Sequence, residues 1–354
     1  MQKSKALIAM SGGVDSSVAA YLTAQEGYSC IGGTMLLYDN GDVCGSSAAI
    51  GDARAVAERL GMPFHVFALT EAFKDYVICD FISCYENGLT PNPCIRCNRH
   101  LKFSAFLEQA KALNCDCMVT GHYAQIRKDE TTGRYLLCKA VDTAKDQSYF
   151  LYAVTQEQLS KIRFPLGELT KDQVRAIALE QGFVNAKKRD SQDICFVPDG
   201  DYYAFLRSFT GKDYAPGDFL DVNGKKVGTH QGAASYTLGQ RKGLGLAMGQ
   251  PVYVCGKDMK ENTVTVGPEE NLFHKELRAN DWFFFPFSTL TEPMDVMAKT
   301  RSRMAEQPAT VYPEDNGYCR VVFHQPQRAM TPGQAVVLYD GDVVVGGGTI
   351  TEVL

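Results

Sequence analysis

The chain has 354 residues, of which 45% are hydrophobic and 22% charged, and its formal net charge is −5 at pH 7. These values are ordinary for a soluble globular protein of two or three domains, and no apolar run is long enough to span a bilayer. The apolar stretch after Lys5 is too short for a signal peptide, so we expect a cytoplasmic protein with no membrane partner. The 12 cysteines then favour metal or redox chemistry over a framework of structural disulfides. The negative net charge disfavours a nucleic-acid partner, although local basic patches weigh more than the total.

The most informative segment is residues 6–17, where an apolar run ends in Ser-Gly-Gly and a helical pattern follows over residues 16–26. Two glycines let the backbone approach a phosphate without Cβ clashes, while serine hydroxyls and a helix N-terminus supply hydrogen-bond donors. The pattern therefore predicts a pyrophosphate-binding loop, in which Asp15 is placed to hold Mg²⁺. The lysine of a Walker loop is absent, and the alternative is a glycine-rich turn that binds nothing.

Strand and helix patterns continue to alternate up to residue 205. We expect strands at 30–35, 64–69 and 117–120, and helices at 48–60, 71–86, 103–114, 156–162 and 171–181. This alternation predicts an α/β domain over residues 1–205 with a doubly wound, mostly parallel sheet. Because such sheets bind ligands beyond the carboxyl ends of their strands, the glycine loop, Met35 and Gly121 are expected to face one crevice.

After about residue 206, short β-rich pieces alternate with turns, and Asn223-Gly224 is a hairpin signal. We expect a small β-rich central domain over residues 206–273 and a barrel-like C-terminal domain over residues 277–354. Basic clusters at 187–189, 241–242 and 299–303 would suit phosphate contacts if they share one side of the protein. Each cluster alone is typical of a solvated surface.

A second candidate site lies at residues 90–99, which contain Cys94-x-x-Cys97. Two prolines exclude a helix until after them, and the neighbouring arginines favour the thiolate form of Cys97. The alternative is half of a structural zinc site, although the chain has no second C-x-x-C. Cys195 lies between a polar and an apolar run and would, taken alone, be an inert core thiol.

Several motifs follow one another along the chain in a characteristic order. They are the loop 11–17, the segment 90–98, Gly121-His122-Tyr123, residues 145–149, residues 190–196, residues 236–241 and Pro332-Gly333-Gln334-Ala335. The first motif resembles the loop of the N-type ATP pyrophosphatases (PP-loop proteins). The whole set resembles the bacterial tRNA-specific 2-thiouridylases, the MnmA/TrmU family, over essentially the full chain. The resemblance implies a PP-loop domain followed by two β-rich domains, and conversion of the wobble uridine (position 34) of tRNA to 2-thiouridine with ATP and a persulfide.

The resemblance also implies roles for individual residues. ATP with Mg²⁺ is expected at Ala9, Met10, Ser11, Gly12, Gly13, Val14, Asp15, Ser16, Met35 and Gly121. Contacts with tRNA are expected from Asn92, Pro93, Cys94, His122, Lys145, Asp146, Gln147, Arg301, Ser302 and Gln334. Cys97 matches the catalytic nucleophile and Cys195 the cysteine that carries the persulfide. The second expected partner is a protein that donates persulfide sulfur, either a cysteine desulfurase or a relay protein.

The chain departs from the family pattern at Cys94, where the family commonly has Asp, and at Ser302, where it has Tyr. Cys94 leaves a second route open, in which Cys94, Cys97 and Cys195 hold three irons of a [4Fe–4S] cluster and the fourth iron binds hydrosulfide. A rival enzyme is another ligase with the same loop, such as an amidotransferase-type synthetase, which the paired cysteine segments disfavour. A noncatalytic zinc- or RNA-binding protein is the rival of another class, and the intact loop disfavours it.

Overall fold

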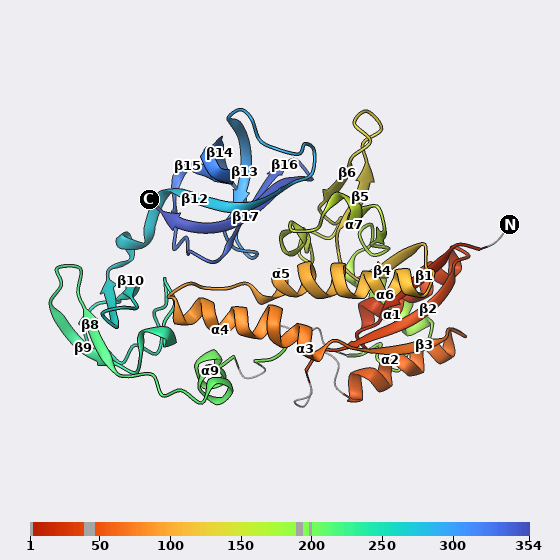
Figure 1. Ribbon diagram of the computed structural model, residues 1–354, viewed down its shortest axis with the longest axis horizontal. Helices are drawn as coiled ribbons and strands as arrows, with labels where there is room; N and C mark the ends of the chain where they lie inside the picture. The colour runs from red at the N-terminus through yellow and green to blue at the C-terminus, as the bar shows by residue number, and fades with distance from the viewer. Residues whose placement is uncertain (1–2, 39–46, 189–193, 198–199) are drawn as a thin grey trace.

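The computed structural model describes residues 3–38, 47–188, 194–197 and 200–354. The strands form a parallel sheet, a small central sheet and a large sheet built mainly from the C-terminal strands. Figure 1 shows the parallel sheet (red) at one end of the molecule and the small sheet (green) at the other. The C-terminal strands (blue) lie above the helices that run between these two ends.

The parallel sheet has five strands in the order β3-β2-β1-β4-β7. They are β1 (Lys5–Ala9), β2 (Ser29–Leu36), β3 (Phe64–Ala68), β4 (Cys117–Thr120) and β7 (Ile162–Arg163). In β1, Ala6 and Ile8 pack into one hydrophobic core while Leu7 packs into another, because successive side chains of a strand point to opposite faces. Both faces are therefore covered, which confirms the predicted doubly wound α/β architecture.

Two long helical stretches run beside the sheet toward the central domain (Figure 1). One consists of α3 (Thr70–Phe73), the π-helical η1 (Lys74–Ile78) and α4 (Cys79–Glu86), and the other of α5 (Pro93–Cys97), the π-helical η2 (Asn98–Ala105) and α6 (Phe106–Ala112). The second stretch was predicted to begin at residue 103. It begins earlier because Pro93 occupies the first helical position, where a missing N–H costs no hydrogen bond.

The remaining helices are shorter or lie at domain edges. They are α1 (Val14–Gln25), α2 (Ser47–Arg59), α7 (Gln156–Leu159), α8 (Lys171–Glu180) and α9 (Tyr202–Thr210), with 3₁₀ turns η3 (Ser148–Leu151), η4 (Ala233–Ser235), η5 (Glu269–Leu272) and η6 (Asp315–Gly317). The helix predicted over 156–162 is too long, because Ile162 pairs with Met118 in the sheet. Across the described ranges, no helix has both the length and the apolar character that a membrane crossing requires.

The central sheet has the order β10-β11-β8-β9. Its strands are β8 (Gly217–Leu220), β9 (Lys226–His230), β10 (Tyr253–Asp258) and β11 (Thr263–Gly267). Strands β8 and β9 pair antiparallel across Asn223-Gly224, which confirms the predicted hairpin.

The C-terminal strands close into a barrel because β12 pairs with both β15 and β17. The barrel strands are β12 (Phe273–Phe284), β13 (Met294–Lys299), β14 (Gln307–Pro313), β15 (Cys319–Arg328), β16 (Ala335–Asp340) and β17 (Val343–Val353). A hairpin of the first domain, β5 (Gln125–Lys128) and β6 (Tyr135–Cys138), extends this sheet through the pair Val343–Cys138. The prediction of a barrel-like C-terminal domain is confirmed.

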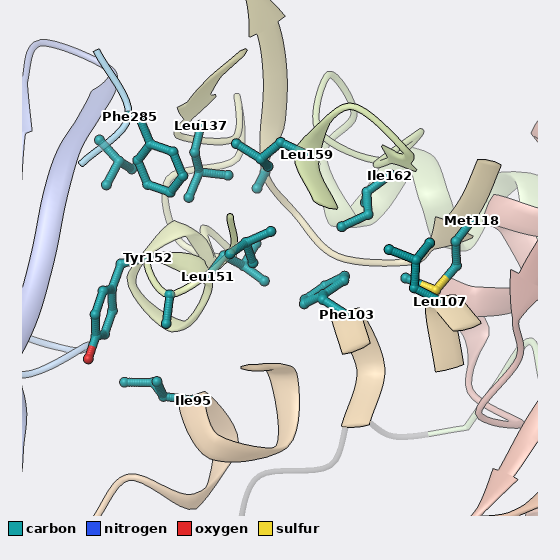
Figure 2. Close-up of a cluster of buried hydrophobic side chains, with 14 of the residues drawn as sticks. Ile95, Phe103, Leu107, Met118, Leu137, Leu151, Tyr152, Leu159, Ile162 and Phe285 are labelled. Carbon is teal, nitrogen blue, oxygen red and sulfur yellow. The ribbon is translucent and has the colours of Figure 1, made fainter. Parts of the chain in front are cut away.

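One hydrophobic cluster is shared by the first domain and the barrel (Figure 2). It joins Ile95 of α5 and Phe103 of η2 to Tyr152, and then to Phe285, which follows β12. All four side chains are at most 5% exposed. The barrel is thus packed against the helix that carries Cys94 and Cys97.

Candidate functional site

The glycine loop between β1 and α1 is held by backbone sterics and by its own serines. Gly12 has φ +73°, and a Cβ there would lie 2.3 Å from the carbonyl oxygen of Ala49. The Ser11 amide donates to Ser16 Oγ (3.1 Å), and the Ser16 hydroxyl donates to the Gly13 carbonyl (3.1 Å). Only glycine fits at position 12, and the loop is braced before any ligand arrives.

The ends of three neighbouring strands meet at this loop. Gly121 follows β4, and a Cβ on it would lie 2.7 Å from the carbonyl carbon of Asp15. Thr34 of β2 donates through its hydroxyl to the Met10 carbonyl (2.6 Å), and Met35 is the next residue of that strand. Residues at the ends of β1, β2 and β4 thus meet at the carboxyl edge of the sheet, the edge where this type of fold binds ligands.

Asp15 is engaged by two residues that the sequence pattern did not single out as site residues. Lys171, the first residue of α8, places Nζ 2.7 and 2.9 Å from the Asp15 oxygens, and the Tyr123 hydroxyl donates to Oδ1 (2.9 Å). The Lys171 side chain is only 6% exposed. A lysine absent from the loop motif is therefore supplied by a distant helix. The only local signal was the capping box at Thr170 that opens α8.

Two more side chains reach the loop from the segment after α8. Asn185 Nδ2 donates to the Gly12 carbonyl (3.0 Å) and to Ser17 Oγ (2.9 Å). Lys188 Nζ lies 2.9 Å from Asp52 Oδ2 and 3.4 Å from the Gly12 carbonyl. Among the described residues, the buried Asn185 Oδ1 has no hydrogen-bond partner. Lys188 was predicted only as part of a surface basic cluster, whereas the structure places it at the phosphate loop; its neighbour Arg189 lies outside the described residues.

The two cysteines of interest are brought to one apolar cluster. Cys97 is 8% exposed and belongs to a hydrophobic cluster that includes Phe81 of α4. The partly exposed Cys195 packs against the same cluster. Phe196, the neighbour of Cys195, meets the Phe81 ring at 5.2 Å between centroids. The structure thus carries segments 97 and 195 to the same place. Residues 190–193 of the second motif lie outside the described residues.

Cys94 lies on the same helix as Cys97 but differs from it in exposure. Within residues 3–38, 47–188, 194–197 and 200–354, no group of three His, Cys, Asp or Glu side chains is arranged to hold a metal ion. Cys94 is exposed, whereas Cys97, one helical turn further along α5, is buried. The described residues thus show no preformed metal-ligand set, and the [4Fe–4S] alternative stays a prediction.

The successive parts of the chain match known families in the same order as the sheets. Residues 4–199 match the family described as "tRNA methyl transferase HUP domain", residues 203–268 the "tRNA methyl transferase PRC-barrel domain" and residues 274–350 the "Aminomethyltransferase beta-barrel domain". The chain is 49% identical to the tRNA-specific 2-thiouridylase MnmA of Clostridioides difficile (strain 630), over 99% of each chain. It is also 49% identical to the protein of that name from Acetivibrio thermocellus, over 99% of this chain and 100% of the relative.

The chain belongs to the tRNA-specific 2-thiouridylase family. Among solved structures, it is similar to a 4-thiouridine synthetase in complex with RNA and ATP at 16% identity, with a TM-score of 0.36, over 58% of this chain and 50% of that one. An NMN synthetase from Francisella tularensis gives a TM-score of 0.34 at 16% identity, over 60% of this chain and 79% of that one.

Several residues that the family resemblance assigns to tRNA are engaged within the protein. Asp146 Oδ1 accepts from the Ala140 amide (3.0 Å), and Gln147 Oε1 accepts from the Tyr123 amide (3.0 Å). Arg301 Nη2 donates to the Ala329 carbonyl (2.9 Å). Asp146 and Gln147 thus organise loops of the first domain, and Arg301 organises a loop of the barrel. Their contact with tRNA stays a prediction, as does that of Lys145 and Ser302.

His122 follows β4 and is packed against aromatic side chains rather than lying in bulk solvent. Its Nδ1 is 2.7 Å from the Thr120 hydroxyl, and its ring packs between Phe103 and Phe164. Burial, with a smaller contribution from Lys102, lowers the pKa of His122 well below its ordinary value. The imidazole is therefore neutral at pH 7, which suits a hydrogen bond to a base more than an ionic contact with a phosphate.

Proposed function

We propose that this protein thiolates a uridine of tRNA in two steps, activation of the C2 carbonyl oxygen by adenylation and replacement of that oxygen by sulfur. The observation that carries the proposal is that Cys97 and Cys195, far apart in sequence, pack into one cluster in a domain that also holds a braced phosphate loop. A uridine oxygen is a poor leaving group, and a phosphate-binding loop is what its activation by ATP requires. The names of the close relatives state the same substrate and product.

The residues around the loop fit a triphosphate. The close approach of Gly12 to Ala49 and the hydrogen bond that Asn185 Nδ2 donates to the Gly12 carbonyl fix the loop at the N-terminus of α1, whose amides can donate to phosphate oxygens. Lys188, whose side chain is 42% exposed, can leave Asp52 for a phosphate, whereas the buried Lys171 holds Asp15 in place. ATP supplies the adenylyl group. Both Asp15 oxygens lie within 2.9 Å of Lys171 Nζ, so this arrangement does not fit the Mg²⁺ role that the resemblance implies for Asp15.

The sulfur step uses both cysteines. A persulfide on Cys195, received from a donor protein, attacks the activated C2 carbon through its outer sulfur, and AMP leaves. The Cys97 thiolate then attacks the Cys195 sulfur, so that a Cys97–Cys195 disulfide forms and the outer sulfur stays on the base as 2-thiouridine. A thiol reductant restores both cysteines. Cys94, where the family commonly has Asp, is exposed on α5, the helix that also carries Cys97. We expect Cys94 to contact the target base, as the family resemblance implies.

The test separates activation from sulfur delivery. With unmodified tRNA, ATP and a persulfide donor, Cys195→Ser should still release pyrophosphate in a tRNA-dependent manner but form no 2-thiouridine by nucleoside mass spectrometry. Cys255→Ser is the matched control, because Cys255 is also partly exposed but lies in β10 of the central domain. Normal thiolation by Cys195→Ser would remove Cys195 from the mechanism. Pyrophosphate release that ignores tRNA would favour a different ligase.

A further inference from the structure

The segment that carries Cys94 and Cys97 is held by the barrel at both of its ends. Before α5, the Thr90 amide donates to the Pro332 carbonyl (2.9 Å), and Gln334 Nε2 donates to the carbonyls of Thr90 (3.2 Å) and Pro91 (3.0 Å). After Cys97, the guanidinium of Arg99 pairs with the Asp281 carboxylate, with one N–O distance of 3.2 Å. Both cysteines thus lie between two contacts to the same domain.

The first contact is built as a close backbone fit. Gly333 has φ +91°, and a Cβ there would lie 2.9 Å from both the amide nitrogen and the carbonyl oxygen of Thr90. The same loop is fixed to the barrel, because the Gly333 amide donates to the Ile350 carbonyl (2.8 Å) and the Ile350 amide donates back to the Gln334 carbonyl (2.8 Å). The loop is therefore fixed to the barrel, and it holds residues 90–91 through hydrogen bonds and close packing.

The second contact holds a residue in an unfavourable backbone conformation. Asp281 has φ +54°, and the pairing of β12 with β17 shifts register between Asn280 and Phe283. The bulge directs the carboxylate toward Arg99, whose guanidinium also lies over the Phe283 ring at 4.8 Å. Non-glycine residues in the left-handed region persist where the surroundings require them, and they gather at functional places.

We propose that Gln334 and Asp281 are positioning residues that use the barrel to set the place of Cys97 for the sulfur step. Gln334 acts through the backbone of Thr90 and Pro91, which leads directly into α5, and Asp281 acts through Arg99, just beyond Cys97. This role differs from the tRNA contact that the resemblance assigns to Gln334. The positioning role rests on the proposed function only for its effect on thiolation. The accessibility of Cys97 can be measured without any substrate.

The test is the reactivity of Cys97 in the full-length protein without ATP or tRNA. Gln334→Met keeps the length of the side chain but removes both donated hydrogen bonds. Loss of two neutral hydrogen bonds shifts a local opening equilibrium about tenfold, so alkylation of Cys97 by iodoacetamide should rise about tenfold. Cys94, already exposed, serves as the internal reference and should keep its rate. The rates are read by mass spectrometry of the labelled peptides.

A matched control and a second variant make the outcome decisive. Gln327 is another glutamine of the barrel, buried where Gln334 is partly exposed, with Nε2 donating to the Gln325 carbonyl (2.7 Å), and Gln327→Met should leave Cys97 at its original rate. Asp281→Gly removes the carboxylate, and glycine adopts φ +54° without strain, so this variant too should raise the rate. In turnover with saturating tRNA, Gln334→Met should still release pyrophosphate but lose about tenfold in 2-thiouridine formation.

Two results would overturn the assignment. Unchanged alkylation of Cys97 in both Gln334→Met and Asp281→Gly would show that the barrel does not hold this segment in place. Weaker tRNA binding by Gln334→Met with normal Cys97 alkylation would make Gln334 an RNA contact and nothing more. Absence of thiolation in the unaltered protein would instead count against the proposed function, because the alkylation measurement does not depend on it.

Discussion

Replacement of Lys171 by Met tests how the phosphate loop is held. The Lys171 side chain is 6% exposed, and its ammonium lies within 2.9 Å of both oxygens of Asp15, whose side chain is 33% exposed. Removing one partner of a buried ion pair costs about 3–5 kcal/mol, because the other charge stays behind in a poorly hydrated place. Asp15 retains some contact with water and the hydrogen bond from Tyr123, so we expect the lower end, about 3 kcal/mol.

This loss is large enough to measure by calorimetry. For a domain of this size, each kcal/mol moves the unfolding temperature by about 2–4 °C, so Lys171→Met should unfold about 6–12 °C lower at pH 7. Lys188→Met is the matched control. Lys188 also pairs with an aspartate beside the loop, Asp52, but both of these side chains are more than a third exposed, at 42% and 34%. A pair this exposed contributes about 1 kcal/mol or less.

The double variant Asp15→Asn, Lys171→Met identifies the cause of the loss. Removing both charges avoids a stranded carboxylate, and replacement of a whole buried pair is often nearly neutral, so most of the unfolding temperature should return. Neither variant should support tRNA-dependent pyrophosphate release at the original rate. A Lys171→Met protein that unfolds at the original temperature, or a double variant no more stable than Lys171→Met, would refute the role given to this pair.

Two further predictions concern sterics and pH. Gly121→Ala should weaken ATP binding about 5- to 100-fold, because its Cβ would lie 2.7 Å from the Asp15 backbone, whereas Gly51→Ala in α2, where a Cβ meets open space, should bind ATP normally; equilibrium dialysis compares them, and equal affinities would contradict the placement of Gly121. Burial lowers the pKa of Lys257 from 10.5 to about 8, so below pH 8 the folded protein holds a poorly hydrated charge, and stability is gained as pH rises from about 8 to 10.5. Lys257→Met also loses the hydrogen bond to the Tyr236 carbonyl, an effect that does not depend on pH, so the test is the trend: the unfolding temperature of the variant relative to the original protein should fall as pH rises from 8 to 10. A relative stability that grows with pH would contradict this sign.

Local sequence was sufficient for the elements whose shape depends on local chemistry. The apolar run of β1, the glycines of the loop and the start of α1 follow one another within a dozen residues, and Asn223-Gly224 defines its own hairpin. The start of α5 was missed because two prolines were taken to delay the helix, whereas Pro93 itself is the first helical residue. Steric rules exclude proline from the interior of a helix, but they do not tell which of the permitted positions a given proline occupies.

The missing parts of the candidate site are contacts between distant segments. Lys171 reaches Asp15 across 156 residues of sequence, and Gln334 reaches Thr90 across 244. Periodicity and motif spacing describe one element at a time, so they cannot show which side chain a fold brings to which loop. A buried lysine at the start of an amphipathic helix is an anomaly that composition alone does not reveal, because lysine in the first turn of a helix is ordinary on a surface.

The charges around the loop explain how a phosphate site works without a lysine in its own motif. Asp15 and Asp52 bring two negative charges to a place meant for an anion, and Lys171 and Lys188 balance them. The two ion pairs differ in burial, and therefore in how much free energy their separation costs. Separation of the buried pair would strand a charge, so Lys171 stays with Asp15 and fixes the start of α1. Separation of the exposed pair costs little, so Lys188, already 3.4 Å from the Gly12 carbonyl, is the lysine that a phosphate can recruit. We therefore expect positioning and phosphate binding, which one Walker lysine combines, to be divided here between Lys171 and Lys188.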